Sequence, residues 1–241
     1  YGITMFAISG VEIALWDALG KEKNKPIHEL LGKKNKDLFK AYSSLFRYGD
    51  PKIVEQKCKQ SLDDGYQAIK LHEIENNCIE AGRKGTGNLP LMLDTNCPWT
   101  RDEARQMLNS WEEFNLYWVE EPINPPENFQ ALSKLRKETE MAIAAGENAC
   151  TAFEFKKMME ASSIDYAQPS VTKVGGITEF RKIATLCEVY GVQLMPHSPY
   201  FGPGFLATLH LSQAIPNSGM IERIFIEPET NLYGNSTYDP V

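Results

Sequence analysis

The sequence has no excess of basic residues and little cysteine, and both absences narrow the class of protein. Lys and Arg number 25 against 32 Asp and Glu, so the formal net charge is −7. Because no basic stripe stands out, we do not expect a nucleic-acid partner. The cysteines are odd in number and lack the spacing of a metal site, so we expect them to be reduced in a cytoplasmic protein. They are Cys58, Cys78, Cys97, Cys150 and Cys187.

Long apolar runs and a signal-peptide pattern are also lacking. We therefore expect neither a membrane-spanning segment nor a membrane partner. The 241 residues are enough to bury one substantial core, and barrels of this size are common single domains.

The sequence does contain three acidic residues that each end a short apolar run. Asp94 follows Leu-Met-Leu, Glu120 follows Leu-Tyr-Trp-Val, and Glu147 follows Ala-Ile-Ala-Ala-Gly. The separations are 120 − 94 = 26 and 147 − 120 = 27 residues, which matches one strand, one helix and two loops. In a (β/α)₈ barrel the carboxyl ends of all strands surround one mouth. Three carboxylates there would repel each other, and an oxygen-ligated cation such as Mg²⁺ or Mn²⁺ would compensate them.

The same spacing continues in both directions along the chain. Lys70 lies 94 − 70 = 24 residues before Asp94, and His72 shares its strand face because side chains alternate along a strand. Alternating strand and helix patterns of this length favour a parallel sheet with helical crossovers. The predicted fold is therefore a (β/α)₈ TIM-type barrel. Later polar strand ends follow at separations of 23, 27 and 25 residues, at Ser170, His197 and Glu222.

The predicted elements divide the chain into three parts. Residues 1–37 form a helical lead-in, residues 38–226 form the barrel, and residues 227–241 form a C-terminal segment. Thr100-Arg-Asp-Glu103 has the capping-box pattern and predicts the start of a helix. Other helices are predicted over 51–62, 128–137, 151–160, 178–190 and 204–214, and an eighth strand over 220–226.

The motifs in series resemble those of the enolase superfamily, in its mandelate racemase/muconate lactonizing enzyme branch. The resemblance implies a modified TIM-type barrel that follows an N-terminal α+β capping domain, which we expect to be absent from this chain. It rests on Ser9-Gly-Val-Glu12, Ala68-Ile-Lys-Leu-His72, Leu93-Asp-Thr-Asn96, Trp118-Val-Glu-Glu-Pro122, Ala145-Gly-Glu-Asn148, Gln168-Pro-Ser-Val-Thr-Lys-Val-Gly-Gly176 and Met195-Pro-His-Ser198.

The resemblance implies a role for each strand-end residue. Asp94, Glu120 and Glu147 would bind Mg²⁺, or Mn²⁺ in its place, with Glu120 rather than Glu121 as the ligand. Residues of the substrate site would be Lys70 on the substrate carboxylate, His72 and His197 as acid/base groups on opposite faces, Glu222 as a hydrogen-bonding group, and Asn96, Ser170 and Lys173 as lining residues.

The chemistry implied by the resemblance is removal of the proton α to a carboxylate. We expect an acid-sugar dehydratase, a homo-oligomer acting on a small carboxylate; racemisation or epimerisation, and a catalytically silent barrel, are the alternatives. Two residues depart from the family pattern. Many relatives carry Lys-x-Lys where this chain has Lys70-Leu-His72, and Ser170 stands where an Asp usually supports the histidine. A surface ion pair with Arg223 is an alternative interpretation of Glu222.

Overall fold

Short strands alternate with helices in the computed structural model, which describes residues 2–32 and 38–226. The strands alternate with helices along these residues, and strands β1 to β5 pair in parallel, so the predicted parallel α/β alternation is confirmed. The predicted segment 227–241 lies outside the described residues. The strands are β1 (Ala41–Ser44), β2 (Ile69–Leu71), β3 (Leu91–Asp94), β4 (Trp118–Glu120), β5 (Ile143–Ala145), β6 (Tyr166–Ala167), β7 (Gln193–Leu194) and β8 (Ile221–Ile224).

The chain divides into two compact units, which are described one at a time. The β1–β5 unit comprises Ala41–Ala145 and Lys157–Tyr166, and the β7–β8 unit comprises Tyr1–Lys40, Gly146–Lys156 and Ala167–Val241. Helix α7 (Ala152–Glu160) contributes residues to both. We expected boundaries at residues 37 and 226 from the sequence. The division into units rests on spatial contacts and does not test them, so they stay a prediction.

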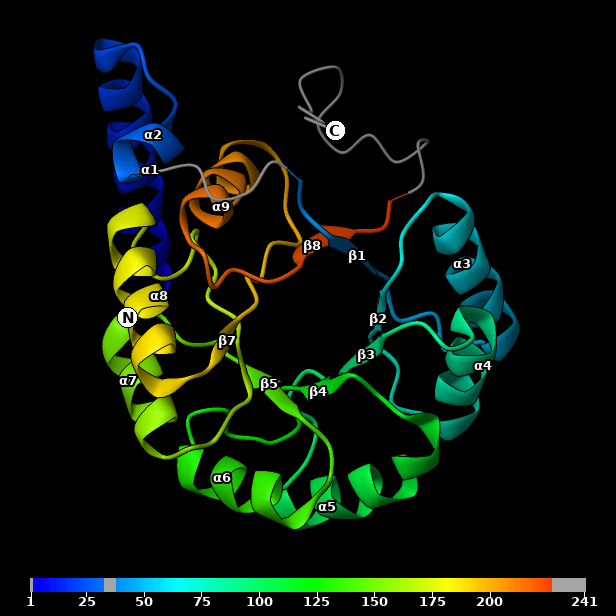
Figure 1. The fold of residues 1–241 in the computed structure, drawn as a ribbon. Helices are drawn as coiled ribbons and strands as arrows, with labels where there is room; N and C mark the ends of the chain where they lie inside the picture. The colour runs from blue at the N-terminus through cyan, green and yellow to red at the C-terminus, as the bar shows by residue number, and fades with distance from the viewer. Residues whose placement is uncertain (1, 33–37, 227–241) are drawn as a thin grey trace. The chain divides into compact units, whose positions relative to one another are not determined.

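The β1–β5 unit carries its strands in sequence order, with every neighbouring pair parallel. Its helices lie on one side of these strands (Figure 1). Local sequence fixes the helix starts: the side chains of Asp50, Thr100 and Asn128 each accept a hydrogen bond from a backbone N–H of the first turn, and Thr100 forms the predicted capping box. The helices are α3 (Pro51–Asp63), α4 (Asn76–Thr86), α5 (Arg101–Ser110), the 3₁₀ turn η1 (Glu112–Phe114) and α6 (Phe129–Glu138).

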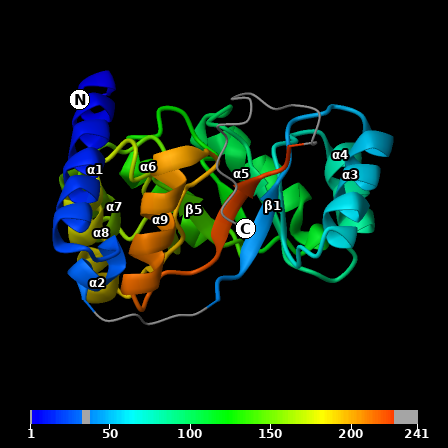
Figure 2. The same cartoon turned by 90° about the horizontal axis from the view of Figure 1, so that it is seen from above.

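Helix α4 was not expected as an element, because two glycines lie inside it and glycine disfavours helix. Here the glycines permit close packing. A Cβ on Gly82 would lie 2.3 Å from Leu71 Cδ1, and one on Gly85 would lie 2.7 Å from Cys58 Cβ and 2.8 Å from the Glu55 carbonyl oxygen. Helices α3 and α4 accordingly lie side by side (Figures 1 and 2). Packing therefore selects glycine where helix propensity alone would reject it.

The β7–β8 unit contains α1 (Ile3–Lys23), α2 (Ile27–Leu31), α8 (Ile177–Tyr190) and α9 (Gly202–Ala214). Helix α1 lies beside α8 (Figure 2). The Glu12 carboxylate accepts hydrogen bonds from the first amides of α8, at 2.6 Å from Ile177 N and 2.9 Å from Thr178 N. A carboxylate at this position offsets the positive end of the α8 dipole. Glu12 therefore fixes the end of the loop that follows β6.

Helix α1 buries a different face from its most apolar one. Ser9, Ile13 and Gly20 are buried, whereas Val11 and Leu15 are 64% and 65% exposed. By length and mean hydropathy α1 is the one helix, among residues 2–32 and 38–226, apolar enough to cross a bilayer. The expectation that no run is long enough was therefore wrong. A single such helix near the N-terminus is weak evidence for a membrane segment, because soluble core helices and signal sequences meet the same criterion.

Candidate functional site

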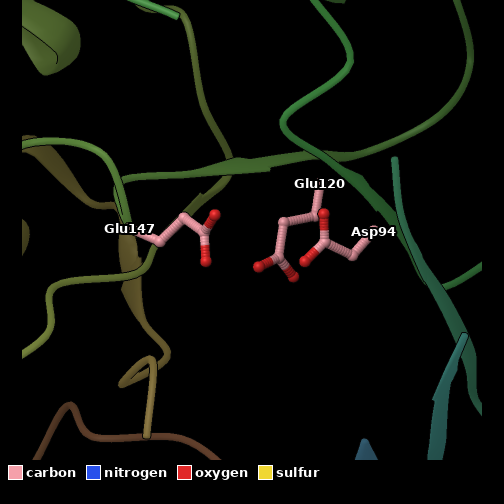
Figure 3. Close-up of side chains that lie close together, drawn as sticks. All are labelled: Asp94, Glu120 and Glu147. Carbon is pink, nitrogen blue, oxygen red and sulfur yellow. The ribbon is translucent and has the colours of Figure 1, made fainter. Parts of the chain in front are cut away.

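Two buried carboxylates and a buried lysine form a cluster at the strand ends of the β1–β5 unit. Asp94 and Glu120 are register partners on β3 and β4, and their side chains lie next to each other in Figure 3. Lys70, which is 0% exposed, places its Nζ 3.0 and 3.1 Å from the Glu120 oxygens and 3.5 Å from Asp94 Oδ2. We call Lys70, Asp94 and Glu120 the carboxylate cluster. Its formal charge is −2 + 1 = −1, away from water.

Neighbouring groups fix the orientation of both carboxylates. Trp118, two residues earlier on β4, donates from Nε1 to Glu120 Oε2 at 3.2 Å. The backbone N–H of Asn96 donates to Asp94 Oδ1 at 2.9 Å. Asn96 and Cys97 both have φ of 56° and Glu121 has φ of 47°. Left-handed backbone at non-glycine residues is costly and concentrates at functional sites, so this edge of the sheet has the backbone strain typical of a binding site.

His72 lies at the same edge, on the loop after β2. Its Nε2 lies 3.2 Å from Asp94 Oδ2, and its Nδ1 lies 2.5 Å from the carbonyl oxygen of Leu45. Two of the predicted site residues, Lys70 and His72, therefore both contact Asp94. A third, Asn96, contacts the same side chain through its backbone. The structure thus brings together every site residue that was predicted within the β1–β5 unit.

Two of the residues predicted in the β7–β8 unit, His197 and Lys173, contact Glu147, the third acid drawn in Figure 3. His197 Nε2 lies 2.6 Å from Glu147 Oε2, and Lys173 Nζ donates to the Glu147 carbonyl oxygen at 3.2 Å. The preceding Gly146 has φ of 136°, and a Cβ there would lie 2.6 Å from the Phe155 ring. The glycine thus allows the chain to pass Phe155 and present Glu147.

Ser170 does not support His197, which contrasts with the usual role of this strand position. Its hydroxyl lies 3.0 Å from Thr172 Oγ1 and 3.3 Å from Tyr200 OH. Among the described residues His197 Nδ1 is buried without a hydrogen-bond partner, while the Tyr200 ring meets the imidazole edge-on at 6.5 Å between centroids. Burial raises the pKa of Tyr200, so its phenol stays protonated. No carboxylate counter-charge reaches His197 through Ser170.

Glu222 is buried rather than on the surface. It is 0% exposed, accepts a hydrogen bond from Ser198 N at 3.2 Å, and receives the Ser198 hydroxyl on its carbonyl oxygen at 2.9 Å. The guanidinium of Arg223 instead stacks on the Phe205 ring at 4.9 Å. Because Glu222 is buried, a surface ion pair does not account for it. Its carboxylate lies beside Ser198, the residue that follows His197.

Two side chains that contact the candidate site were not among the predicted residues. Trp118 was not among the predicted site residues, yet its indole N–H donates to Glu120. Arg47 was overlooked, although it donates to the carbonyl oxygens of His72 and Thr95 and to Asn96 Oδ1. A signal was present: Arg47 precedes His72 by 72 − 47 = 25 residues, the interval that links the other strand ends.

Comparison with known proteins places these residues in a family context. Residues 54–239 match the family model described as enolase C-terminal domain-like. Residues 1–32 match the mandelate racemase/muconate lactonizing enzyme N-terminal domain, so the expected lead-in belongs in large part to that domain. A part of the capping domain's sequence is therefore recognisable in this chain. The expectation that this domain is absent is not confirmed.

Two curated relatives share much of the sequence. The chain is 32% identical to the arabinonate dehydratase of Saccharolobus solfataricus over 231 residues, covering 92% of this chain and 61% of the relative. It is 28% identical to the D-xylonate dehydratase of Haloferax volcanii over 248 residues, covering 92% and 60%. The chain therefore spans about three fifths of the length of these relatives.

A solved structure of a racemase from Streptomyces coelicolor, with bound magnesium, is also similar. Its TM-score is 0.81 at 28% identity, with 90% of this chain and 66% of the racemase covered. Dehydratases and racemases thus both occur among the relatives. Sequence identities of 28% to 32% do not distinguish between the two reactions.

Proposed function

Because this chain belongs to the mandelate racemase/muconate lactonizing enzyme branch of the enolase superfamily, we propose that it forms the catalytic barrel of a Mg²⁺-dependent sugar-acid dehydratase. The observation that carries the proposal is the carboxylate cluster, in which a buried lysine contacts two buried acids at neighbouring strand ends. The names of the two curated relatives support dehydration of a sugar acid. We further propose, from the resemblance alone, a homo-oligomeric cytoplasmic enzyme.

The metal ligands in this proposal are Asp94, Glu120 and Glu147. The fit to a cation rests on donor chemistry: the carboxylate cluster gathers two buried carboxylates at neighbouring strand ends, and their oxygens suit Mg²⁺ or Mn²⁺. Glu147 supplies a third carboxylate at the expected strand-end spacing, and the similar racemase with bound magnesium also supports a divalent cation. When bound, the cation would offset negative charge that develops on the substrate carboxylate.

The chain's own residues would perform the proton transfers. Lys70 would bind the substrate carboxylate, and His72 Nε2 would accept the proton from the α-carbon. His197 Nε2 would give its proton to the β-hydroxyl, so that the carbon–oxygen bond breaks and water leaves. The enol that remains becomes a 2-keto acid by tautomerisation. Glu222 would hydrogen-bond the substrate carboxylate, and Asn96, Ser170 and Lys173 would line the site.

Racemisation or epimerisation is the second candidate, favoured by histidines on both β2 and β7 strand ends and by the similar racemase. In that reaction His197 would return a proton to the α-carbon from the opposite face and no water would leave. Proton NMR in D₂O separates the two reactions. Loss of the α-proton signal without formation of a 2-keto acid would favour the racemase and contradict the dehydratase.

The proposal is tested by incubating the 241-residue chain with Mg²⁺ and a panel of pentonic and hexonic acids, and by following 2-keto-3-deoxy acids through their semicarbazones. We expect product with at least one acid, and its loss in Glu120→Gln. Glu113→Gln is the matched control, because Glu113 is exposed on η1 and its neutralisation leaves the carboxylate cluster intact. A barrel that forms no product and exchanges no α-proton would be catalytically silent.

A further inference from the structure

We propose that Ser9 and Glu12 of α1 are positioning residues, which hold the loop after β6 so that Lys173 lies against Glu147. The inference rests on the proposed function for the role of Lys173, and it gives a role to a helix that carries none of the predicted site residues. All of these residues belong to the β7–β8 unit. Ser9 and Glu12 lie in the part that matches the N-terminal domain model, whereas the loop lies in the part that matches the C-terminal domain model.

The first contact is made by both oxygens of the Glu12 carboxylate. Oε2 accepts a hydrogen bond from Ile177 N at 2.6 Å, and Oε1 accepts one from Thr178 N at 2.9 Å. The indole N–H of Trp16 donates to the same Oε1 at 2.8 Å and thereby orients the carboxylate. A Cβ at Gly176 would lie 2.1 Å from Glu12 Oε2. A glycine at this position therefore allows the carboxylate to lie against the backbone where the loop ends.

The second contact is made by Ser9, one turn earlier on α1. Its hydroxyl is buried, accepts a hydrogen bond from Gly175 N at 2.9 Å and donates to the Met5 carbonyl oxygen at 2.7 Å. Gly175 has φ of 100°, a conformation that glycine adopts far more readily than other residues. Because a buried N–H needs an acceptor, alanine at position 9 would leave the Gly175 amide without its partner. Ser9 therefore anchors the loop at a second point.

A tight turn connects these anchors to Lys173. The amides of Lys173 and Val174 both donate to the Ser170 carbonyl oxygen, at 2.9 and 3.0 Å, and the glycine that binds α1 follows directly. The Lys173 ammonium donates to the Glu147 carbonyl oxygen at 3.2 Å. A lysine side chain is flexible, so its direction depends on a fixed backbone. The buried side chains of Val171 and Val174 also hold the turn, and the experiment must separate their effect from that of α1.

Backbone amide hydrogen exchange of the 241-residue chain, measured by NMR, tests the inference without any substrate. In Ser9→Ala and in Glu12→Gln we expect the amides of Lys173 and Val174 to exchange about tenfold faster or more, because the turn opens more often when an anchor is lost. These two amides do not themselves bind α1, so their exchange reports the turn rather than the deleted contact. Asp17→Asn, which removes a surface pair with Lys21 on the same helix, is the matched control and should leave both rates within about twofold of the parent.

Parent-like exchange at Lys173 and Val174 in both folded variants would overturn the inference, even if the amides that bind α1 directly exchange faster. The buried valines would then hold the turn alone. If Glu12→Gln fails to fold, by circular dichroism, Ser9→Ala decides together with Trp16→Phe, which removes the N–H that orients the carboxylate.

A double-variant cycle connects the turn to catalysis. Where dehydration is measurable, Glu12→Gln should lower kcat/KM about fivefold or more in the parent chain, because a displaced side chain in the site slows the reaction. In a Lys173→Met background the same change should cost less than about twofold, because the effect passes through Lys173. Equal losses in both backgrounds, or no loss in the parent, would contradict the positioning role. Faster exchange of the turn amides in variants of a chain that has no activity would refute the dehydratase and leave the anchoring by α1 intact.

Discussion

Replacement of Lys70 by Met tests whether the buried lysine holds the carboxylate cluster together. Lys70 is fully buried, and its Nζ lies 3.0 Å from Glu120 Oε1 and 3.5 Å from Asp94 Oδ2. At an effective dielectric constant of about 20, a charge pair 3.0 Å apart attracts by roughly 332/(20 × 3.0), or about 5.5 kcal/mol. Because Met has no charge, two buried acids would lose their counter-ion. We expect the free energy of unfolding to fall by about 3–5 kcal/mol.

The assay is urea unfolding followed by circular dichroism in the presence of EDTA. Lys59→Met is the matched control, since Lys59 pairs with Glu55 at the surface and its side chain is 58% exposed; its loss should cost less than about 1 kcal/mol. The double variant Lys70→Met/Glu120→Gln should be more stable than the sum of the single effects predicts, by about 1 kcal/mol or more, because the groups interact. A Lys70→Met effect as small as that of Lys59→Met would refute the reasoning.

Three further predictions concern packing, thiol reactivity and pH. Gly85→Ala should destabilise the chain by about 1–3 kcal/mol, because its Cβ would overlap α3, whereas Gly10→Ala, with open space around it, should be neutral or stabilising in the same unfolding assay. Burial raises the pKa of Cys58 to about 11 and that of Cys187 to about 12, so mass spectrometry after brief labelling with a thiolate-directed reagent should find half-buried Cys97 modified well before either. Burial and the neighbouring His28 lower the pKa of His210, so the unfolded chain takes up a proton that the folded chain does not. Stability should therefore fall as pH drops below the ordinary histidine pKa of about 6.5, and His210→Gln should reduce that slope in unfolding curves measured across this range; equal slopes would contradict the assignment.

The sequence predicted the elements well where pattern and local chemistry agree. The capping box at Thr100 and the strands that end at Asp94 and Glu120 are present as expected, because caps and short buried runs are local features. Helix α4 was missed because Gly85 is selected by contact with α3, which no periodicity reveals. The buried face of α1 includes Ser9, whose hydroxyl accepts a hydrogen bond from Gly175 N at 2.9 Å. A sequence pattern does not identify such a polar residue as part of the core.

The candidate site was likewise predictable where it depends on local sequence spacing and not where it depends on side-chain contacts. Strand-end spacing identified Lys70, His72 and Asp94, and the structure places them in contact. Sequence could not show that Ser170 bonds Thr172 and Tyr200 instead of His197, because that depends on side-chain direction after folding. Arg47 was missed because its contacts are hydrogen bonds to main-chain oxygens of distant loops, and the interval of 25 residues to His72 does not by itself reveal them.

The central claim is that the strand-end acids hold a divalent cation, and calorimetric titration of the 241-residue chain with Mg²⁺ and with Mn²⁺ tests it most directly. The account predicts saturable binding at a single site, lost in Asp94→Asn, Glu120→Gln and Glu147→Gln and retained in Glu113→Gln. Absence of binding in the folded parent chain, or binding that survives all three substitutions, would contradict it.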